Sequence, residues 1–111
     1  MILLLKDIAY TRSGDKGRNS NIGVIFKNRS IYNWAKDNIT SENVKKHLQF
    51  IVKGKVIRYE LENLNALNFV LYDSLGGGGS DSLLNDAQGK THGQKLLLMQ
   101  IDFPEKLKEY L

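Results

Sequence analysis

Apolar residues alternate with other residues along four short segments, and this alternation predicts β-strands. The segments are residues 2–10, 21–27, 54–62 and 97–103. The first is apolar on both faces at its start, which is typical of a central strand, and the last is ended by Pro104, which cannot donate a ladder hydrogen bond. We therefore expect a sheet of about four strands.

Apolar residues at a spacing of three or four predict helices between the strands. Thr40 is suited to capping a helix that runs to about residue 49, because its hydroxyl can accept a hydrogen bond from a free amide of the first turn. Leucines at positions 64, 67, 71 and 75 predict a second helix over residues 64–75 that ends at Gly76. Further helical segments are expected over residues 30–34, 86–95 and 105–111.

The order of these elements predicts the fold class. The polar stretch 11–20, which contains Gly14 and Gly17, predicts a loop between the first two strands. Strands and helices are interleaved along the chain without an internal repeat or a linker. We therefore expect one α+β domain over residues 1–111, with a single layer of helices on a mixed sheet.

Composition excludes several classes of protein. At 111 residues, 41% hydrophobic and 25% charged, the chain lies in the range of ordinary globular domains, which argues against disorder and coiled coil. The longest aliphatic run, residues 2–5, is far shorter than the roughly 20 residues of a membrane span. No signal-peptide pattern is present either, so we expect a cytoplasmic protein. The absence of cysteine excludes a disulfide, a thiolate nucleophile and a Cys-ligated metal.

Charge is distributed unevenly along the chain. Residues 1–58 carry 12 Lys and Arg against 4 Asp and Glu, whereas residues 59–111 carry 4 against 8. A basic half can attract nucleic acid, a phosphorylated cofactor or an acidic partner. An unevenly charged, solvated surface explains the same numbers without any ligand.

Three polar clusters that contain glycine are the candidates for chemistry. They are Ser13-Gly14-Asp15-Lys16-Gly17, Gly76-Gly77-Gly78-Gly79 and Asp86-Ala87-Gln88-Gly89-Lys90. In the first, glycines allow consecutive amides to point the same way and bind an anion, Lys16 adds a positive charge and Asp15 can act as a base. The glycine run favours a mobile loop or a close approach of the backbone to a ligand. A tight turn, a flexible loop and a helix cap are the simpler interpretations of the three clusters.

Other polar residues add little specific chemistry. Asn68 lies on the predicted second helix and can present an amide to a carbonyl or a carboxylate, although such residues more often bond to neighbouring loops. The only histidines, His47 and His92, do not have the spacing of a metal site. No nucleophile elbow, P-loop or dinucleotide fingerprint is present. We therefore assign no catalytic residue, metal or cofactor.

The order of the motifs along the chain is more specific than any one of them. It runs through Ala9-Tyr10-Thr11-Arg12-Ser13-Gly14-Asp15-Lys16-Gly17, Asn21-Ile22-Gly23-Val24, Arg58-Tyr59-Glu60-Leu61, Ala66-Leu67-Asn68-Phe69-Val70-Leu71, Leu75 to Gly79 and Asp86-Ala87-Gln88-Gly89-Lys90-Thr91. Over about residues 3–104 this order resembles the AtuA-like ferredoxin-fold domain, which occurs at the C-terminus of acyclic terpene utilisation proteins and as short stand-alone chains. The resemblance implies a ferredoxin-like α+β fold. The candidate ligand-binding residues are Ser13, Gly14, Asp15, Lys16, Gly17, Asn21, Asn68, Gly76, Gly77, Gly78, Gly79, Asp86 and Lys90.

Three functions follow from the resemblance and the clusters. The resemblance implies an accessory subunit or partner domain of a larger AtuA-type enzyme in bacterial breakdown of branched or terpenoid acids, handled as coenzyme A thioesters. The clusters alone favour a small homo-oligomeric enzyme or ligand-binding module for an anionic substrate such as an acyl-CoA. The basic half leaves nucleic-acid binding as a third alternative, although residues 53–59 lack the internal stacking aromatics of the RNA-binding pattern.

Overall fold

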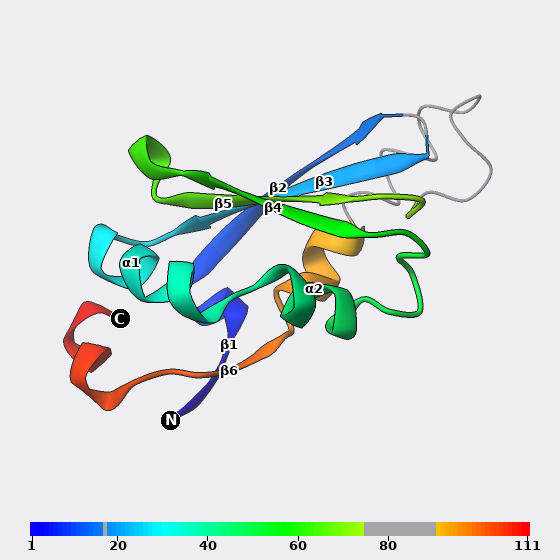
Figure 1. Ribbon diagram of the computed structural model, residues 1–111. Helices are drawn as coiled ribbons and strands as arrows, with labels where there is room; N and C mark the ends of the chain where they lie inside the picture. The colour runs from blue at the N-terminus through cyan, green and yellow to red at the C-terminus, as the bar shows by residue number, and fades with distance from the viewer. Residues whose placement is uncertain (17, 75–90) are drawn as a thin grey trace.

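The computed structural model describes residues 1–16, 18–74 and 91–111. A four-stranded sheet forms one layer, and helices with a two-stranded ribbon lie below it (Figure 1). In spatial order, the strands of the sheet are β2 (Ala9–Lys16), β3 (Asn19–Phe26), β5 (Ala66–Leu71) and β4 (Val56–Leu61). The expected α+β fold with helices on one side of a four-stranded sheet is confirmed. Every pairing in this sheet is antiparallel, where the sequence predicted a mixed one.

The polar stretch 11–20 belongs to a strand hairpin, so the predicted loop is wrong. β2 and β3 are paired from Ala9 opposite Phe26 to Lys16 opposite Asn19. Because β2 is an edge strand, its polar side chains can reach water while its backbone is paired on one side. The predicted continuous strand over residues 2–10 is likewise interrupted by the helical turn η1 (Leu5–Asp7).

Residues 64–75 do not form the predicted helix either. Residues 66–71 form β5, which hydrogen-bonds to β3 on one side and to β4 on the other. Leu67, Phe69 and Leu71 are buried on the inner face, and Asn68 and Val70 lie on the outer face. Leu67 and Leu71, four residues apart, also fit this two-residue alternation, and two flanking strands outweigh a local helical preference.

Helices cover the inner face of the sheet (Figure 1). They are α1 (Arg29–Asn38) and α2 (Ser41–His47), with a short helical segment over residues 91–96. Asn28 caps α1 by accepting a hydrogen bond from the backbone of Ile31, and Thr40 caps α2 by accepting one from Asn43, as predicted for Thr40. Of the helix predicted over residues 86–95, the first five residues lie outside the described part of the chain.

The two ends of the chain form a separate two-stranded ribbon. β1 (Ile2–Leu4) pairs antiparallel with β6 (Gln100–Asp102), and η3 (Glu105–Tyr110) follows β6. β6 is shorter than the predicted strand over residues 97–103, because the backbone of Leu97 still donates to the carbonyl of Gly93 in helical fashion. The ribbon closes the lower layer beneath α1 and α2 (Figure 1).

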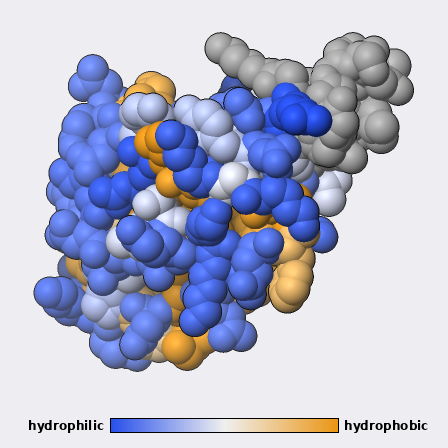
Figure 2. Space-filling model, turned by 45° about the vertical axis from the view of Figure 1, so that its right-hand side comes forward, coloured by the Kyte–Doolittle hydropathy of each residue, from blue (hydrophilic) through white to orange (hydrophobic). Residues whose placement is uncertain are grey.

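Large apolar side chains fill the space between the two layers. Those that are fully buried include Leu5, Ile8, Ile22, Ile31, Tyr32, Leu67, Phe69 and Phe103. The rings of Trp34 and Phe103 meet edge to face, with their centroids 5.1 Å apart, so the half-buried Trp34 packs against the core. On the face seen in Figure 2, hydrophilic residues cover most of the surface and hydrophobic residues form small, separate patches.

None of the helices in the described part of the chain has the length and apolar character needed to cross a membrane. The same residues contain no group of three or more His, Asp or Glu side chains placed to hold a metal ion.

Candidate functional site

The outer face of the four-stranded sheet is covered by no other described element (Figure 1). Residues that face each other across paired strands share a face, so the register gives its composition. We call this surface the open face; it consists of Tyr10, Arg12, Gly14, Asn21, Gly23, Ile25, Ile57, Tyr59, Leu61, Asn68 and Val70. Tyr10 is 53% exposed and Tyr59 is 49% exposed, both high fractions for large aromatic residues.

Two asparagines are joined near the centre of the open face. The side-chain amide of Asn21, on β3, donates to the Oδ1 of Asn68, on β5, at 3.2 Å. Gly14 lies opposite Asn21 in the register, and a Cβ at Gly14 would lie 2.6 Å from the Oδ1 of Asn21. Glycine at position 14 therefore leaves room for the asparagine pair.

A hollow of about 410 Å³ lies beside the asparagine pair. It is lined by Asn19, Ser20, Asn21, Asn68, Val70 and Tyr72. Asn19 accepts a hydrogen bond from the backbone of Asp73 at 2.9 Å, and Asn68 accepts from Asn21. Since an amide carries both an acceptor and donors, the Nδ2 groups of Asn19 and Asn68 remain to donate to a ligand. Lys55 adds a positive charge here, with its Nζ 5.1 Å from the centre of the Tyr72 ring.

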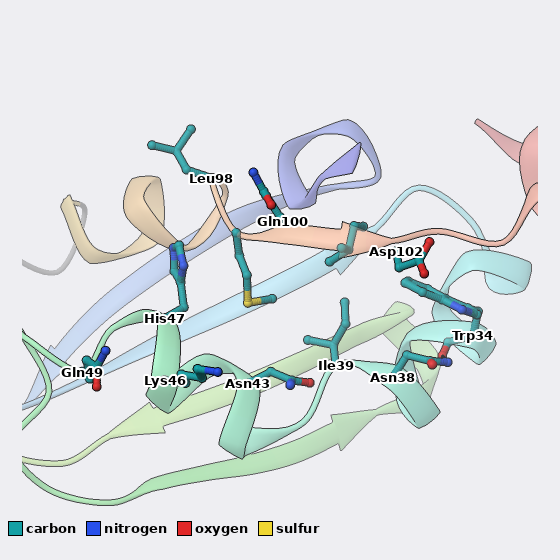
Figure 3. A pocket seen from close by; sticks show the side chains of 12 residues that line it. Trp34, Asn38, Ile39, Asn43, Lys46, His47, Gln49, Leu98, Gln100 and Asp102 are labelled. Carbon is teal, nitrogen blue, oxygen red and sulfur yellow. Dashed lines mark hydrogen bonds between the residues drawn. The ribbon is translucent and has the colours of Figure 1, made fainter. Parts of the chain in front are cut away.

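A second and larger hollow, of about 820 Å³, lies on the helical side of the molecule (Figure 3). We call it the β6 groove. It is lined by Trp34, Asn38, Ile39, Asn43, Lys46, His47, Gln49, Leu98, Met99, Gln100, Ile101 and Asp102. In Figure 3, residues of α1 and α2 form one wall, and β6 with the two residues before it, Leu98 and Met99, forms the other. His47 joins the walls at one end, with its Nε2 2.8 Å from the carbonyl oxygen of Lys95.

Comparison with known families decides what kind of domain this is. The model of the AtuA ferredoxin-like domain matches residues 3–102, which is most of the chain. The chain belongs to the AtuA ferredoxin-like domain family. The resemblance inferred from the order of the motifs is therefore confirmed. No curated protein and no solved structure matches the chain significantly.

The candidate residues of this AtuA ferredoxin-like domain are divided between the two faces of its sheet. Gly14, Asn21 and Asn68 come together on the open face. Ser13 points to the inner side, where a Cβ at Gly93 would lie 2.5 Å from its Oγ. A single ligand on the open face would therefore contact the asparagine pair without contacting Ser13.

The remaining candidates of the AtuA ferredoxin-like domain are located only in part. The backbones of Asp15 and Lys16 end β2 opposite Ser20 and Asn19, two residues that line the smaller hollow. Gly17, Gly76, Gly77, Gly78, Gly79, Asp86 and Lys90 lie outside the described residues. Of the three clusters, the described residues therefore include only the first, without Gly17.

Sequence reasoning missed the β6 groove entirely. Its two walls come from residues 34–49 and 98–102, which are distant in the sequence. The only local sign is the basic end of α2, where Lys45, Lys46 and His47 follow one another. Basic residues at a helix C-terminus are also explained by the helix dipole, so this sign does not indicate a site.

A charged cluster fixes α1 to the edge of the sheet and is separate from both hollows. Glu62, which begins the turn η2 (Glu62–Leu64) between β4 and β5, lies 3.0 Å from Lys36 and 3.0 Å from Arg29. Its hydrogen bond with Lys36 lowers the pKa of the Glu62 carboxyl. Burial raises the pKa of Tyr32, and the charge of Glu62 raises it further. We attribute this cluster to structure, because it bridges a helix and a turn.

Proposed function

We propose that this AtuA ferredoxin-like domain is an accessory subunit or partner domain of a larger AtuA-type enzyme. The enzyme would act in bacterial breakdown of branched or terpenoid acids, as coenzyme A thioesters. The open face supports the proposal most directly, because a sheet face with exposed aromatic side chains is suited to packing against another protein. Membership of the family supports a larger AtuA-type polypeptide as the partner.

The composition of the open face fits a protein interface. Tyrosine and arginine are enriched among residues that dominate binding energy, and the face offers Tyr10, Tyr59 and Arg12. Ile25, Ile57, Leu61 and Val70 add apolar area between them. Four strands at about 4.8 Å spacing make a surface roughly 20 Å wide, which matches the central part of an ordinary interface.

Substitution on and off the open face tests the docking role. The chain would be coexpressed with a larger AtuA-type polypeptide from the same bacterium, and the complex measured by co-purification and by titration calorimetry. We expect Tyr59→Glu to weaken binding at least about 100-fold, because it buries an unpaired charge in the interface.

Phe50→Glu is the matched control, because Phe50 is 84% exposed but lies outside the open face. It should bind like the wild type. A chain that never copurifies with the larger polypeptide, or a Tyr59→Glu variant that binds normally, would contradict the proposal.

The asparagine pair supports a second candidate, a homo-oligomeric enzyme or ligand-binding module for an anionic substrate. The free amide groups of Asn19 and Asn68, with Lys55 nearby, can receive the oxygen atoms of an acyl-CoA or another anion. At the end of β2, Lys16 occupies a register position on the same face as Gly14 and Asn21, where a positive charge would favour an anion, whereas Asp15 alternates to the face of Ser13.

Thermal shifts with coenzyme A and acetyl-CoA test this second candidate. We expect both ligands to stabilise the wild type, and Asn68→Leu to abolish the shift because it removes the amide donor. Asn33→Leu, an exposed site on α1, should retain the shift. Equal shifts for both variants would contradict a site at the asparagine pair.

Nucleic-acid binding is the least supported of the three functions. Sheets that bind RNA stack bases on aromatic residues of the central strands. The central strands β3 and β5 carry their phenylalanines, Phe26 and Phe69, on the buried face. The exposed tyrosines, Tyr10 and Tyr59, are on the edge strands, so they offer no adjacent stacking platform.

A further inference from the structure

The β6 groove runs along the edge of a strand. Five consecutive residues, 98–102, line it. Side chains alternate between the two faces of a strand, so a surface that touches five in succession follows the backbone edge. No residue of β1 lines the groove, so this is the edge that β1 leaves free.

The hydrogen bonds of the ribbon show which backbone groups face the groove. The backbone of Leu5 donates to Met99 at 2.9 Å, and that of Phe103 donates to Met1 at 2.8 Å. Bonded pairs recur every second residue in an antiparallel ladder, so Ile101 is bonded to β1 and Gln100 and Asp102 face away from it. Their N–H and C=O groups form an unpaired strand edge, because the described residues contribute no third strand to the ribbon.

We propose that the β6 groove binds an extended peptide segment of a partner polypeptide, which adds to β6 as a third strand and places an acidic side chain near Lys46. Unpaired edges attract another strand, and natural proteins usually protect them. Addition of a peptide to such an edge is a recurrent mode of recognition, in which main-chain hydrogen bonds supply affinity and alternate side chains supply specificity.

The groove offers a different environment to each side of such a peptide. Ile39 and Met99 are buried core residues that form part of its lining, and the half-buried Trp34 stands at one end. Side chains that point inward would meet this apolar lining, and alternate ones would point to water. The peptide should therefore alternate apolar and polar residues, as a half-buried strand does.

Charge favours an acidic residue at the α2 end of the groove. Of the three basic residues there, Lys45 donates to the carbonyl of Gly54, and His47 is hydrogen-bonded to Lys95. Lys46 is exposed and makes no ion pair or hydrogen bond with another described residue, so its charge is available to a ligand. At the opposite end of the groove, Asp102 is paired with the N-terminal ammonium at 3.5 Å, so Lys46 carries the charge that is left for the peptide.

Phage-displayed random dodecapeptides test the proposal. Peptides would be selected for binding to the wild-type protein, and those that also bind the Gln100→Pro variant would be removed. Proline removes one free N–H and places its ring on the edge without disturbing a bond to β1. We expect the wild type to enrich alternating peptides that contain an acidic residue. Their affinity should fall at least about tenfold with Gln100→Pro and with Lys46→Glu. Gln100→Ala, which keeps the backbone N–H, should lose far less affinity than Gln100→Pro, and Lys53→Glu, which lies outside the groove, should bind normally.

Peptide chemistry gives a second measurement that does not depend on the folding of Gln100→Pro. Synthetic versions of an enriched peptide would carry one N-methyl group at successive positions. Methylation should abolish binding at every second position and have little effect between them, because only alternate amides face β6. No enrichment over the Gln100→Pro variant, or an effect without this two-residue period, would overturn the proposal.

The experiments also separate this site from other occupants and from the open face. If sedimentation shows a wild-type dimer that Gln100→Pro converts to a monomer, the edge pairs with a second copy and the peptide proposal is wrong. Tyr59→Glu should leave peptide binding unchanged, because Tyr59 lies on the opposite side of the fold (Figure 1). Failure of the docking proposal would therefore not imply failure of this one.

Discussion

Phe69 and Asn68 are neighbours in β5, and they stand on opposite faces of one sheet. Phe69 is fully buried between the sheet and the helices, whereas Asn68 bonds Asn21 on the open face. The same contrast holds in β3 between Ile22, which is buried, and Asn21. One face of these strands thus provides the packing that holds the fold, and the other provides groups that a ligand or partner can reach.

Stability and recognition should therefore be separable in this domain, residue by residue. Substitutions on the inner face should lower the free energy of unfolding. Those on the open face should change binding and leave stability almost unaltered. The following substitutions test that division, from the largest expected effect to the smallest.

Truncation of adjacent residues in β5 tests the division most directly. Phe69→Ala leaves a cavity in the core and should lower the free energy of unfolding by about 3–5 kcal/mol. Asn68→Ala removes one partly exposed hydrogen bond and should cost less than about 1 kcal/mol. Urea denaturation followed by circular dichroism measures both values. Similar losses for the two variants would show that the faces are not separable.

The close approach of residues 91–96 to β2 tests the inner side in a second way. A Cβ at Gly93 would lie 2.5 Å from Ser13 Oγ and 3.0 Å from Thr11 Oγ1, so Gly93→Ala should destabilise the fold by about 1–3 kcal/mol. Adding Ser13→Ala removes the nearer atom and should recover part of the loss. A double-mutant cycle with no coupling between positions 13 and 93 would contradict this packing.

Acid stability should depend on a histidine buried on the inner side. Burial lowers the pKa of His92, and the nearby charge of Lys95 lowers it further. The unfolded chain therefore takes up this proton first as the pH falls through about 6.5, so stability is complete above that pH and declines below it. Melting temperatures between pH 7.5 and 5.5 should fall for the wild type and for His47→Gln. His92→Gln should show a smaller slope.

Gly14→Ala should have the smallest effect on stability and still alter the open face. The new Cβ would meet the Oδ1 of Asn21, which can turn away because it is the end of a side chain. We expect a loss of less than about 1 kcal/mol, together with loss of the bond to Asn68. Chemical shifts of the two side-chain amides report that bond. An unchanged amide pattern would mean that Gly14 is not needed for the asparagine pair.

The sequence predicted part of this fold correctly, and each wrong prediction has a physical cause. The cap at Thr40 was predicted correctly, because capping depends on residues within one turn. The strand at residues 66–71 was predicted as a helix, because Leu67 and Leu71 fit both periods and only pairing with two distant strands decides between them. Residues 11–20, which hold most of β2 and the start of β3, were predicted as a loop, because an edge strand with a solvent-exposed face carries no continuous apolar pattern. The strand predicted over residues 21–27 corresponds to most of β3 and is confirmed.

The sites were predictable only where one strand pair forms them. Asn21 and Asn68 were both candidates, and the structure adds that β3 and β5 bring them together. The β6 groove depends on the packing of α1 and α2 beside a strand some 50 residues later. Lys46 and Gln100 have no signature in the sequence, because neither residue type is unusual on a surface.

The pairing of β1 with β6 has a consequence for the order of folding. The hairpin of β2 and β3 closes a turn of a few residues, whereas the terminal ribbon closes a loop of nearly the whole chain. Loop-closure entropy makes closure of the terminal ribbon roughly 3 kcal/mol more costly. We therefore expect the ribbon amides to exchange with deuterium faster than those of β3 and β5. A peptide bound along β6 should slow that exchange selectively. The partner would then stabilise the pairing of the two ends of the chain.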